Sequence, residues 1–296
     1  MKLLAHRVLG NARAAKTGWL VHGLFGCGRN LTALGKSLIA NTAAGGVDWR
    51  IVLVDLRGHG GNVGAASTRF QAPHTLDACV DDLAQLAASI GAPDTVVGHS
   101  LGAKVSLAAL SGNPGVCASP FGTHRGNHLR VCAIDPAIGI HVPGTGADLI
   151  DAVLRVVHAA PLLLPSRDWI AAACTAEGLP EKIGAWLAGT AVDLGAAGPG
   201  YRWGFDPTVA QALYQDHCAR DLWPVVTHEP PRGVHVDLIV AGRSRRWKSP
   251  GSAAQLAVAA ATPGVTVHTV DGGHWLHTDN LPGLVAALMP AFTTPT

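Results

Sequence analysis

The chain has 296 residues, which is enough for one large α/β domain or for a core domain that carries an insertion. Hydrophobic residues make up 48% of it and supply a sizeable core, while 22 basic and 20 acidic residues leave a net charge of +2. A balance so close to neutral argues against nucleic acid or an acidic surface as a partner. No run of apolar residues is long enough to span a bilayer, so stable membrane insertion is not expected.

In the first half of the chain, short apolar runs alternate with segments of helical periodicity. The expected strands are 3–9, 18–21, 50–56, 95–97 and 129–134, and the expected helices are 30–40, 76–90 and 101–110. This alternation is typical of a mostly parallel, doubly wound α/β sheet with helices on both faces. Ligands bind at the carboxyl ends of the strands in such sheets.

The alternation stops between about residues 141 and 222. Four helices and no strand are expected there, at 149–159, 168–176, 181–188 and 208–217. We interpret this region as an all-helical cap, inserted after the sixth strand of the sheet and covering the strand ends. Strands and helices alternate again at 234–241, 253–261, 265–270 and 281–289. The expected division is therefore a core formed by 1–140 and 223–296 and a cap formed by 141–222.

The segment Gly98-His99-Ser100-Leu101-Gly102 joins an expected strand to an expected helix. A serine on such a turn has its hydroxyl clear of the sheet and close to the positive end of the helix, where it is useful as a nucleophile. The alternative is that the two glycines serve only a tight turn. The strand before and the helix after the motif favour Ser100 as a nucleophile.

A serine needs a base to accept its proton, and His274 is the first candidate. It follows two glycines directly after the last strand, in a turn that faces the serine at the same edge of the sheet. His277, three residues later, is its rival. We favour His274.

The carboxylate that orients the histidine is missing from the loop after the penultimate strand, residues 242–249. That loop is basic, and no Asp or Glu occurs between Asp237 and Asp271. Asp135, at the end of strand 129–134, is the preferred alternative, because the ends of neighbouring parallel strands are within reach of one another. Asp206 is the second candidate. Either carboxylate also fits a plain capping role, Asp135 before Pro136 and Asp206 before the helix from Thr208.

Five motifs resemble, in order and spacing, those of the α/β-hydrolase family, and most closely its small serine esterase branch of bacteria, mitochondria and plants. They are His22-Gly23-Leu24-Phe25-Gly26, Asp55-Leu56-Arg57-Gly58-His59-Gly60, Gly98-His99-Ser100-Leu101-Gly102, Asp135-Pro136 and Gly273-His274-Trp275-Leu276-His277. The resemblance implies Ser100 as nucleophile, His274 as base and the backbone N–H groups of Leu24 and Leu101 as oxyanion hole. Ala103 departs from it, since a second glycine is common at that position.

These residues together predict a serine hydrolase that cleaves a carboxylic ester or thioester through an acyl-enzyme. Phe25, His99 and Trp275 are expected to contact a small-molecule acyl substrate. No metal or organic cofactor is expected: His124 and His128 have a metal-like spacing, but their loop offers no third ligand. The alternative is a catalytically weak, receptor-like protein that binds a ligand on a hydrolase scaffold.

The six cysteines are scattered without a Cys-x-x-Cys spacing, so they read as reduced thiols. No acidic residue precedes Asp48, as in some organelle transit peptides, although residues 3–9 also fit a first strand. We expect a soluble intracellular protein, in the cytoplasm or in an organelle such as a plastid or mitochondrion. The sequence leaves the oligomeric state open.

Overall fold

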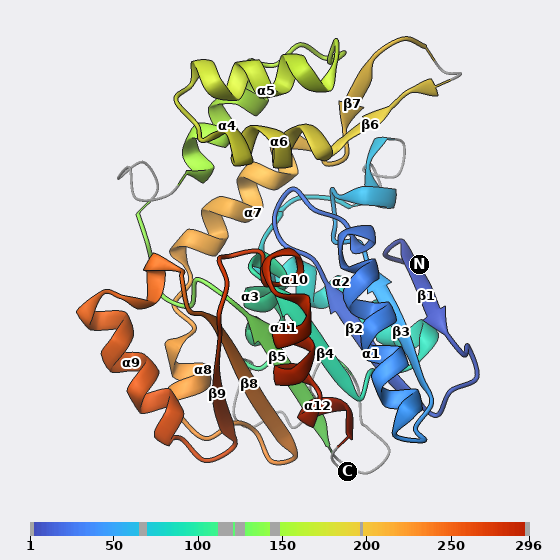
Figure 1. Ribbon diagram of the computed structural model, residues 1–296, viewed down its shortest axis with the longest axis vertical. Helices are drawn as coiled ribbons and strands as arrows, with labels where there is room; N and C mark the ends of the chain where they lie inside the picture. The colour runs from blue at the N-terminus through green and yellow to red at the C-terminus, as the bar shows by residue number, and fades with distance from the viewer. Residues whose placement is uncertain are drawn as a thin grey trace.

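The computed structural model describes residues 3–64, 70–111, 121, 128–142, 149–195 and 198–293. A seven-stranded sheet lies at its centre (Figure 1). In spatial order its strands are β1 (His6–Gly10), β3 (Trp49–Val54), β2 (Lys16–Val21), β4 (Thr95–His99), β5 (Leu129–Ile134), β8 (Val234–Ala241) and β9 (Val265–Val270). Only the β1–β3 pair is antiparallel. The predicted mostly parallel, doubly wound sheet is therefore confirmed.

Helices cover both faces of the sheet, which explains why its strands read as nearly continuous apolar runs. On one face, α1 (Thr32–Ala44), α11 (Leu281–Leu288) and α12 (Pro290–Thr293) bury Leu34, Leu38, Leu284 and Phe292 against it. The other face is covered by α2 (Leu76–Ile90), α3 (Leu101–Ala108), α8 (Trp223–Thr227) and α9 (Pro250–Ala261). A four-residue helix, α10 (Leu276–Asp279), follows β9 at the carboxyl edge. No helix among the described residues has both the length and the apolar character that a bilayer crossing requires.

The segment between β5 and α8 builds a separate layer at the carboxyl ends of the parallel strands (Figure 1). It consists of α4 (Ile150–Ala159), α5 (Arg167–Ala176), α6 (Glu181–Gly189), β6 (Ala191–Asp193), β7 (Tyr201–Trp203) and α7 (Pro207–Ala219). Many of its apolar side chains, among them Val153, Ile170 and Leu187, form a cluster that also includes Phe25 of the core. This arrangement is what allows the layer to cover a site at the strand ends.

Two details of the expected insertion are wrong. The insertion is not all-helical, since β6 and β7 pair as an antiparallel hairpin. Strands of three residues are too short to show an alternating pattern, so no sequence pattern indicates them. In addition, the insertion follows β5, the fifth strand of the described chain rather than the sixth, because a single strand, β1, precedes β2.

Helix α7 is attached to the core at both ends. Ahead of its first turn, the Asp206 N–H donates to the Gly58 carbonyl at 2.7 Å, and the Gly60 N–H donates to the Gly204 carbonyl at 2.8 Å. Near its last turn, the Asp216 carboxylate accepts from the Leu76 N–H at 2.7 Å. The buried Lys104 ammonium of α3 donates to the His217 carbonyl at 2.6 Å. The inserted layer is thus joined to the core through this one helix as well as through its chain ends.

Candidate active site

Ser100 stands on the turn between β4 and α3, with φ 53° and ψ −111°. A non-glycine residue in this region is under strain, which persists only where the surrounding structure imposes it. The flanking glycines are required by close packing: a Cβ on Gly98 would lie 2.4 Å from the Gly102 carbonyl oxygen, and one on Gly102 would lie 2.3 Å from the Val21 carbonyl oxygen. Ala103, the departure noted above, is fully buried in the core. The glycines therefore do more than permit a tight turn.

Three side chains that are far apart in the sequence meet at this turn. The His274 Nε2 lies 3.1 Å from the Ser100 Oγ, and the His274 Nδ1 lies 2.7 Å from the Asp135 Oδ2. A neutral imidazole whose Nδ1–H donates to the carboxylate can accept the serine proton at Nε2. The structure thus assembles a serine, a histidine and a carboxylate in hydrogen-bonding order.

Asp135 is fully buried, and the loop after β8 surrounds it. Its Oδ1 accepts from the Ala241 N–H at 3.2 Å and from the Trp247 Nε1–H at 2.5 Å, while Arg246 donates to its carbonyl oxygen at 2.8 Å. Burial alone raises the pKa of Asp135, but the hydrogen bond from His274 and the charge of Arg246 outweigh it and leave that pKa below its usual value. The carboxylate therefore stays ionised at neutral pH.

Arg246 and Trp247 are site residues that the sequence analysis missed. They belong to the basic loop 242–249. The absence of an acid from this loop pointed to Asp135, but the loop's own side chains were not predicted to bind that carboxylate. A cluster of hydrogen-bond donors opposite an expected carboxylate was the available signal. The other candidate acid, Asp206, caps α7 and accepts from the Thr208 and Val209 N–H groups at 3.0 and 3.2 Å.

The glycine-rich turn after β2 lies against the serine. A Cβ on Gly23 would be 3.2 Å from the Ser100 Cβ, so a larger residue would require its neighbours to shift. Phe25 has φ 63°, and its N–H donates to the His59 Nε2 at 3.2 Å. No acceptor for the Leu24 or Leu101 N–H occurs among the described residues. These two amides remain available to an oxygen atom beside Ser100.

Two buried histidines hold this turn in place. The His59 Nδ1–H donates to the Arg57 carbonyl at 2.9 Å, so its Nε2 is the acceptor for Phe25. His22 donates to the Gly23 carbonyl at 2.8 Å and accepts from the Leu56 N–H at 3.0 Å. Burial lowers the pKa of His22 to about 4, and burial together with the His22 ring lowers that of His59 to about 3. Both rings are therefore neutral, which their double role as donor and acceptor requires.

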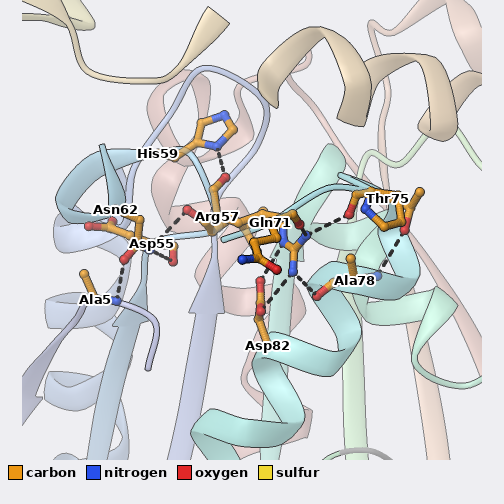
Figure 2. A network of polar contacts seen from close by, with 11 residues as sticks. Ala5, Asp55, Arg57, His59, Asn62, Gln71, Thr75, Ala78 and Asp82 are labelled. Carbon is orange, nitrogen blue, oxygen red and sulfur yellow. Dashed lines mark hydrogen bonds and ion pairs between the residues drawn. The ribbon is translucent and has the colours of Figure 1, made fainter. Parts of the chain in front are cut away.

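The loop after β3 that carries His59 is fixed by the network around Arg57 shown in Figure 2. The buried Arg57 guanidinium donates to both oxygens of Asp82, at 2.7 and 3.0 Å, and to the carbonyl groups of Pro73 and Ala78 at 3.0 Å. The neighbouring Asn62 accepts from the Ala5 N–H at 3.0 Å. The motif at residues 55–60 thus positions the glycine-rich turn through the bond between His59 and the Phe25 N–H.

A cavity of about 440 Å³ opens at Ser100. Its lining includes His99, His274, Trp275 and His277 from the core and Ile150, Lys182 and Trp186 from the inserted layer. Two of the three expected substrate contacts, His99 and Trp275, are therefore part of it.

Phe25, the third expected contact, is placed differently. Its side chain is only 1% exposed and packs on the rings of Phe205 and Trp186, with centroids 4.8 and 5.8 Å away. It lies in the lining of a neighbouring cavity but not in that of the Ser100 cavity. An aromatic residue beside a glycine-rich turn fits either position, so the sequence alone did not separate them.

The remaining histidines of interest lie around this site. The His99 Nε2–H donates to the His274 carbonyl at 2.8 Å and so fixes the backbone of the turn that carries His274. His277, the rival base, stands 4.8 Å from the His99 ring, and burial lowers its pKa to about 4. It is His274 that contacts Ser100. His124 lies outside the described residues.

The sequence matches the α/β hydrolase family over residues 20–288, and the chain belongs to that family. Its fold is also similar to solved structures of low sequence identity. A marine microorganism esterase matches with a TM-score of 0.70 and 17% identity over 98% of this chain and 99% of the other. The enol-lactonase from Burkholderia xenovorans LB400 matches at 0.63 and 15% over 98% and 96%, and a thioesterase domain from the curacin biosynthetic pathway at 0.61 and 17% over 96% and 94%. A comparison with curated protein sequences gave no significant match.

Proposed function

We propose that this protein hydrolyses a carboxylic ester or thioester through an acyl-enzyme formed on Ser100. The observation that carries the proposal is the hydrogen-bonded series Ser100, His274 and Asp135, with distances of 3.1 and 2.7 Å. An ionised, buried carboxylate on Nδ1 and a serine hydroxyl on Nε2 give the imidazole the tautomer that general-base catalysis needs.

In the first step the Ser100 Oγ attacks the carbonyl carbon while His274 takes its proton. The oxyanion that forms accepts hydrogen bonds from the Leu24 and Leu101 amides. His274 then returns the proton to the departing alcohol or thiol, and the ester bond between Ser100 and the acyl group remains. In the second step a water molecule, deprotonated by His274, attacks the acyl carbon, and His274 gives the proton to the Ser100 oxygen as the bond to the acyl group breaks. Removal of a single oxyanion donor costs about 10²- to 10³-fold in such sites.

The substrate class follows from the walls of the cavity. Trp186 and Ile150 from the inserted layer and Trp275 from the core offer apolar surface to an acyl chain, and His99 and His277 offer polar contacts near the reacting carbonyl. Residues 141–222 act in this proposal as a cap over the site, on a core made of 1–140 and 223–296. The reaction uses no metal and no organic cofactor, and its partner is a small acyl ester or thioester.

The test combines covalent labelling with turnover. Wild type should react with a fluorophosphonate probe at Ser100, located by peptide mass spectrometry, and should hydrolyse p-nitrophenyl esters in a series from acetate to laurate. Ser100→Ala should lose both properties while its thermal unfolding is unchanged. Ser106→Ala is the matched control, because Ser106 is buried on the next turn of α3 and bonds only within the helix, to the Gly102 carbonyl. A wild type that is neither labelled nor active would support the receptor-like alternative instead.

A further inference from the structure

A second group of reactive side chains lies beneath the inserted layer, outside the series formed by Ser100, His274 and Asp135. It consists of His141, in the segment after β5, and of His217 and Cys218, in the last turn of α7. One donor atom from each residue can be chosen so that all three lie within 4.8 Å of one another. The sequence did not suggest this cluster, because 75 residues separate His141 from His217 in the chain.

The geometry of the cluster is compact and water-poor. The Cys218 Sγ lies 2.9 Å from the His141 Nε2, and the His141 N–H donates to the Cys218 carbonyl at 3.0 Å. His217 is 8% exposed, and its Nδ1 is buried without a hydrogen-bond partner among the described residues. A buried ring nitrogen of this kind is destabilising unless something binds it. The orphaned nitrogen therefore points to a ligand that the protein's own groups do not supply.

The donor set has the chemistry of a transition-metal site. Imidazole nitrogen and thiolate sulfur are ligands of Zn²⁺, at about 2.0–2.1 and 2.3 Å. Around a tetrahedral ion, those lengths put ligand atoms about 3.5 Å apart. The 2.9 Å distance between the Cys218 Sγ and the His141 Nε2 is shorter than that value, and the 4.8 Å upper limit for the three donor atoms is longer. Shifts of about 1 Å or less would therefore bring the three donors around one ion.

The charges near the cluster also suit a divalent cation. Lys104 lies beside the cluster, and its buried ammonium donates to the His217 carbonyl at 2.6 Å and to the Gly139 carbonyl at 3.1 Å. The charges that act on Lys104 are those of Cys218, Asp216 and Asp221 on the negative side and that of Arg220 on the positive side. With a Cys218 thiolate, the negative charges outnumber the two cations, which favours a bound cation.

We propose that His141, His217 and Cys218 bind one zinc-class divalent metal ion, with water in the fourth position. The ion would join the end of α7 to the segment after β5, on the side of α7 where Lys104 already ties it to the core. On binding, the Cys218 thiol releases its proton to solvent and the thiolate becomes a ligand, without any redox change. The role is structural, and it stands whether or not Ser100 proves to be the nucleophile.

The direct test is titration of the metal-free full chain with Co²⁺ and Zn²⁺. Wild type should bind one equivalent of Co²⁺ with a thiolate-to-cobalt charge-transfer band and the visible bands of a tetrahedral ion, and Zn²⁺ should displace it and raise the Tm. Cys218→Ser should lose the charge-transfer band, and His217→Gln should weaken binding at least tenfold. Cys174→Ser is the matched control and should bind as wild type does, because Cys174 is equally buried, at 1% exposure, but lies in α5.

A second measurement does not depend on any variant folding. X-ray absorption at the zinc edge of Zn²⁺-loaded wild type should show one sulfur ligand at about 2.3 Å and nitrogen ligands at about 2.0–2.1 Å. The proposal fails if Co²⁺ produces no charge-transfer band in wild type, if that band persists in folded Cys218→Ser, or if the zinc-edge spectrum shows no sulfur ligand.

Discussion

Phe25, Ser100 and Asp135 are the non-glycine residues of the described chain with positive φ, at 63°, 53° and 42°. Each of these conformations costs about 1–3 kcal/mol. All three follow the carboxyl ends of neighbouring strands: Ser100 and Asp135 belong to the hydrogen-bonded series, and Phe25 belongs to the glycine-rich turn that lies against Ser100. Contacts with other segments hold each residue in place: His59 binds Phe25, and Trp247 binds Asp135.

At this scale the two candidate acids can be separated by substitution. Asp135→Asn should lower kcat by about 10⁴-fold, because an amide no longer fixes the Nδ1–H tautomer of His274. Asp206→Asn should keep full turnover, since asparagine still caps α7, whereas Asp206→Ala should keep turnover and lose about 1 kcal/mol of stability. Steady-state kinetics and urea unfolding of the three variants check this. Loss of turnover in Asp206→Asn alone would show that the acid has been assigned to the wrong residue.

The sequence predicted the residues that the structure brings together at the candidate site better than the residues that support them. Ser100 and His274 each stand in a local pattern of glycines next to a strand, and such patterns are visible in one dimension. The hydrogen bond from Trp247 to Asp135 joins positions 112 residues apart. The bond from Phe25 to His59 depends on the neutral state that burial imposes on the imidazole and on the tautomer that the Arg57 carbonyl selects. Neither has a local signature.

Among the elements, the turn between β4 and α3 makes the strictest demand on sequence. Gly102→Ala should destabilise the protein by about 3 kcal/mol or more, because the new Cβ would meet the Val21 and His22 carbonyl oxygens at 2.3 and 2.6 Å and backbone cannot move aside cheaply. Gly189→Ala should instead stabilise it by about 0.5–1 kcal/mol, since that helical position has nothing within 4 Å of a new Cβ. Urea midpoints of both variants measure the difference. Equal midpoints for Gly102→Ala and wild type would contradict the close approach of these segments.

The accuracy of the predicted elements follows their burial. The bounds of α2, β5, β8 and β9 agree with those expected from the sequence, because these elements carry long apolar runs or a clear amphipathic period. The first strand begins three residues later than expected, at His6, and is mostly exposed. The hairpin of β6 and β7 exists through pairing between its strands, which no property of either three-residue segment reveals.

For the whole molecule, buried histidines make stability depend on pH. His22 and His59 have pKa values of about 4 and 3 in the folded state, below the usual 6.5, so the unfolded chain binds more protons between those values. Stability should therefore fall as the pH drops below about 6.5, by up to about 1.4 kcal/mol per pH unit for each neutral histidine. Asp135 contributes to the pH dependence in a more acidic range. Its pKa is lower in the folded state than in the unfolded state, so its contribution to stability is complete above the unfolded-state pKa and is lost as the pH falls through the folded-state pKa.

Urea midpoints between pH 7 and pH 5 measure this slope. In His59→Gln, the side-chain oxygen can still accept from the Phe25 N–H, but the side chain does not titrate. The change in stability per pH unit should therefore be smaller than in wild type by the contribution of one histidine. A wild-type midpoint that is independent of pH in this range would show that His22 and His59 are accessible to protons in the folded state.

At the same scale, the order of strands and helices predicted the sheet and the presence of an inserted layer, and the five motifs resembled those of the family to which the chain belongs. The way in which the layer is seated on the core was not predicted. It depends on hydrogen bonds between segments such as Asp216 and Leu76, which are 140 residues apart in the chain.

The attachment of α7 at both ends has a consequence for how substrate enters. A swing of the whole insertion as one lid would break the bonds from Gly58 and Gly60 at one end of α7 and those from Leu76 and Lys104 at the other. Helix α7 therefore behaves as part of the core, and α4, α5, α6 and the β6–β7 hairpin are the portion left to move. Trp186 and Lys182 of α6 border the cavity, so small displacements of that helix would change the width of the cavity beside Ser100.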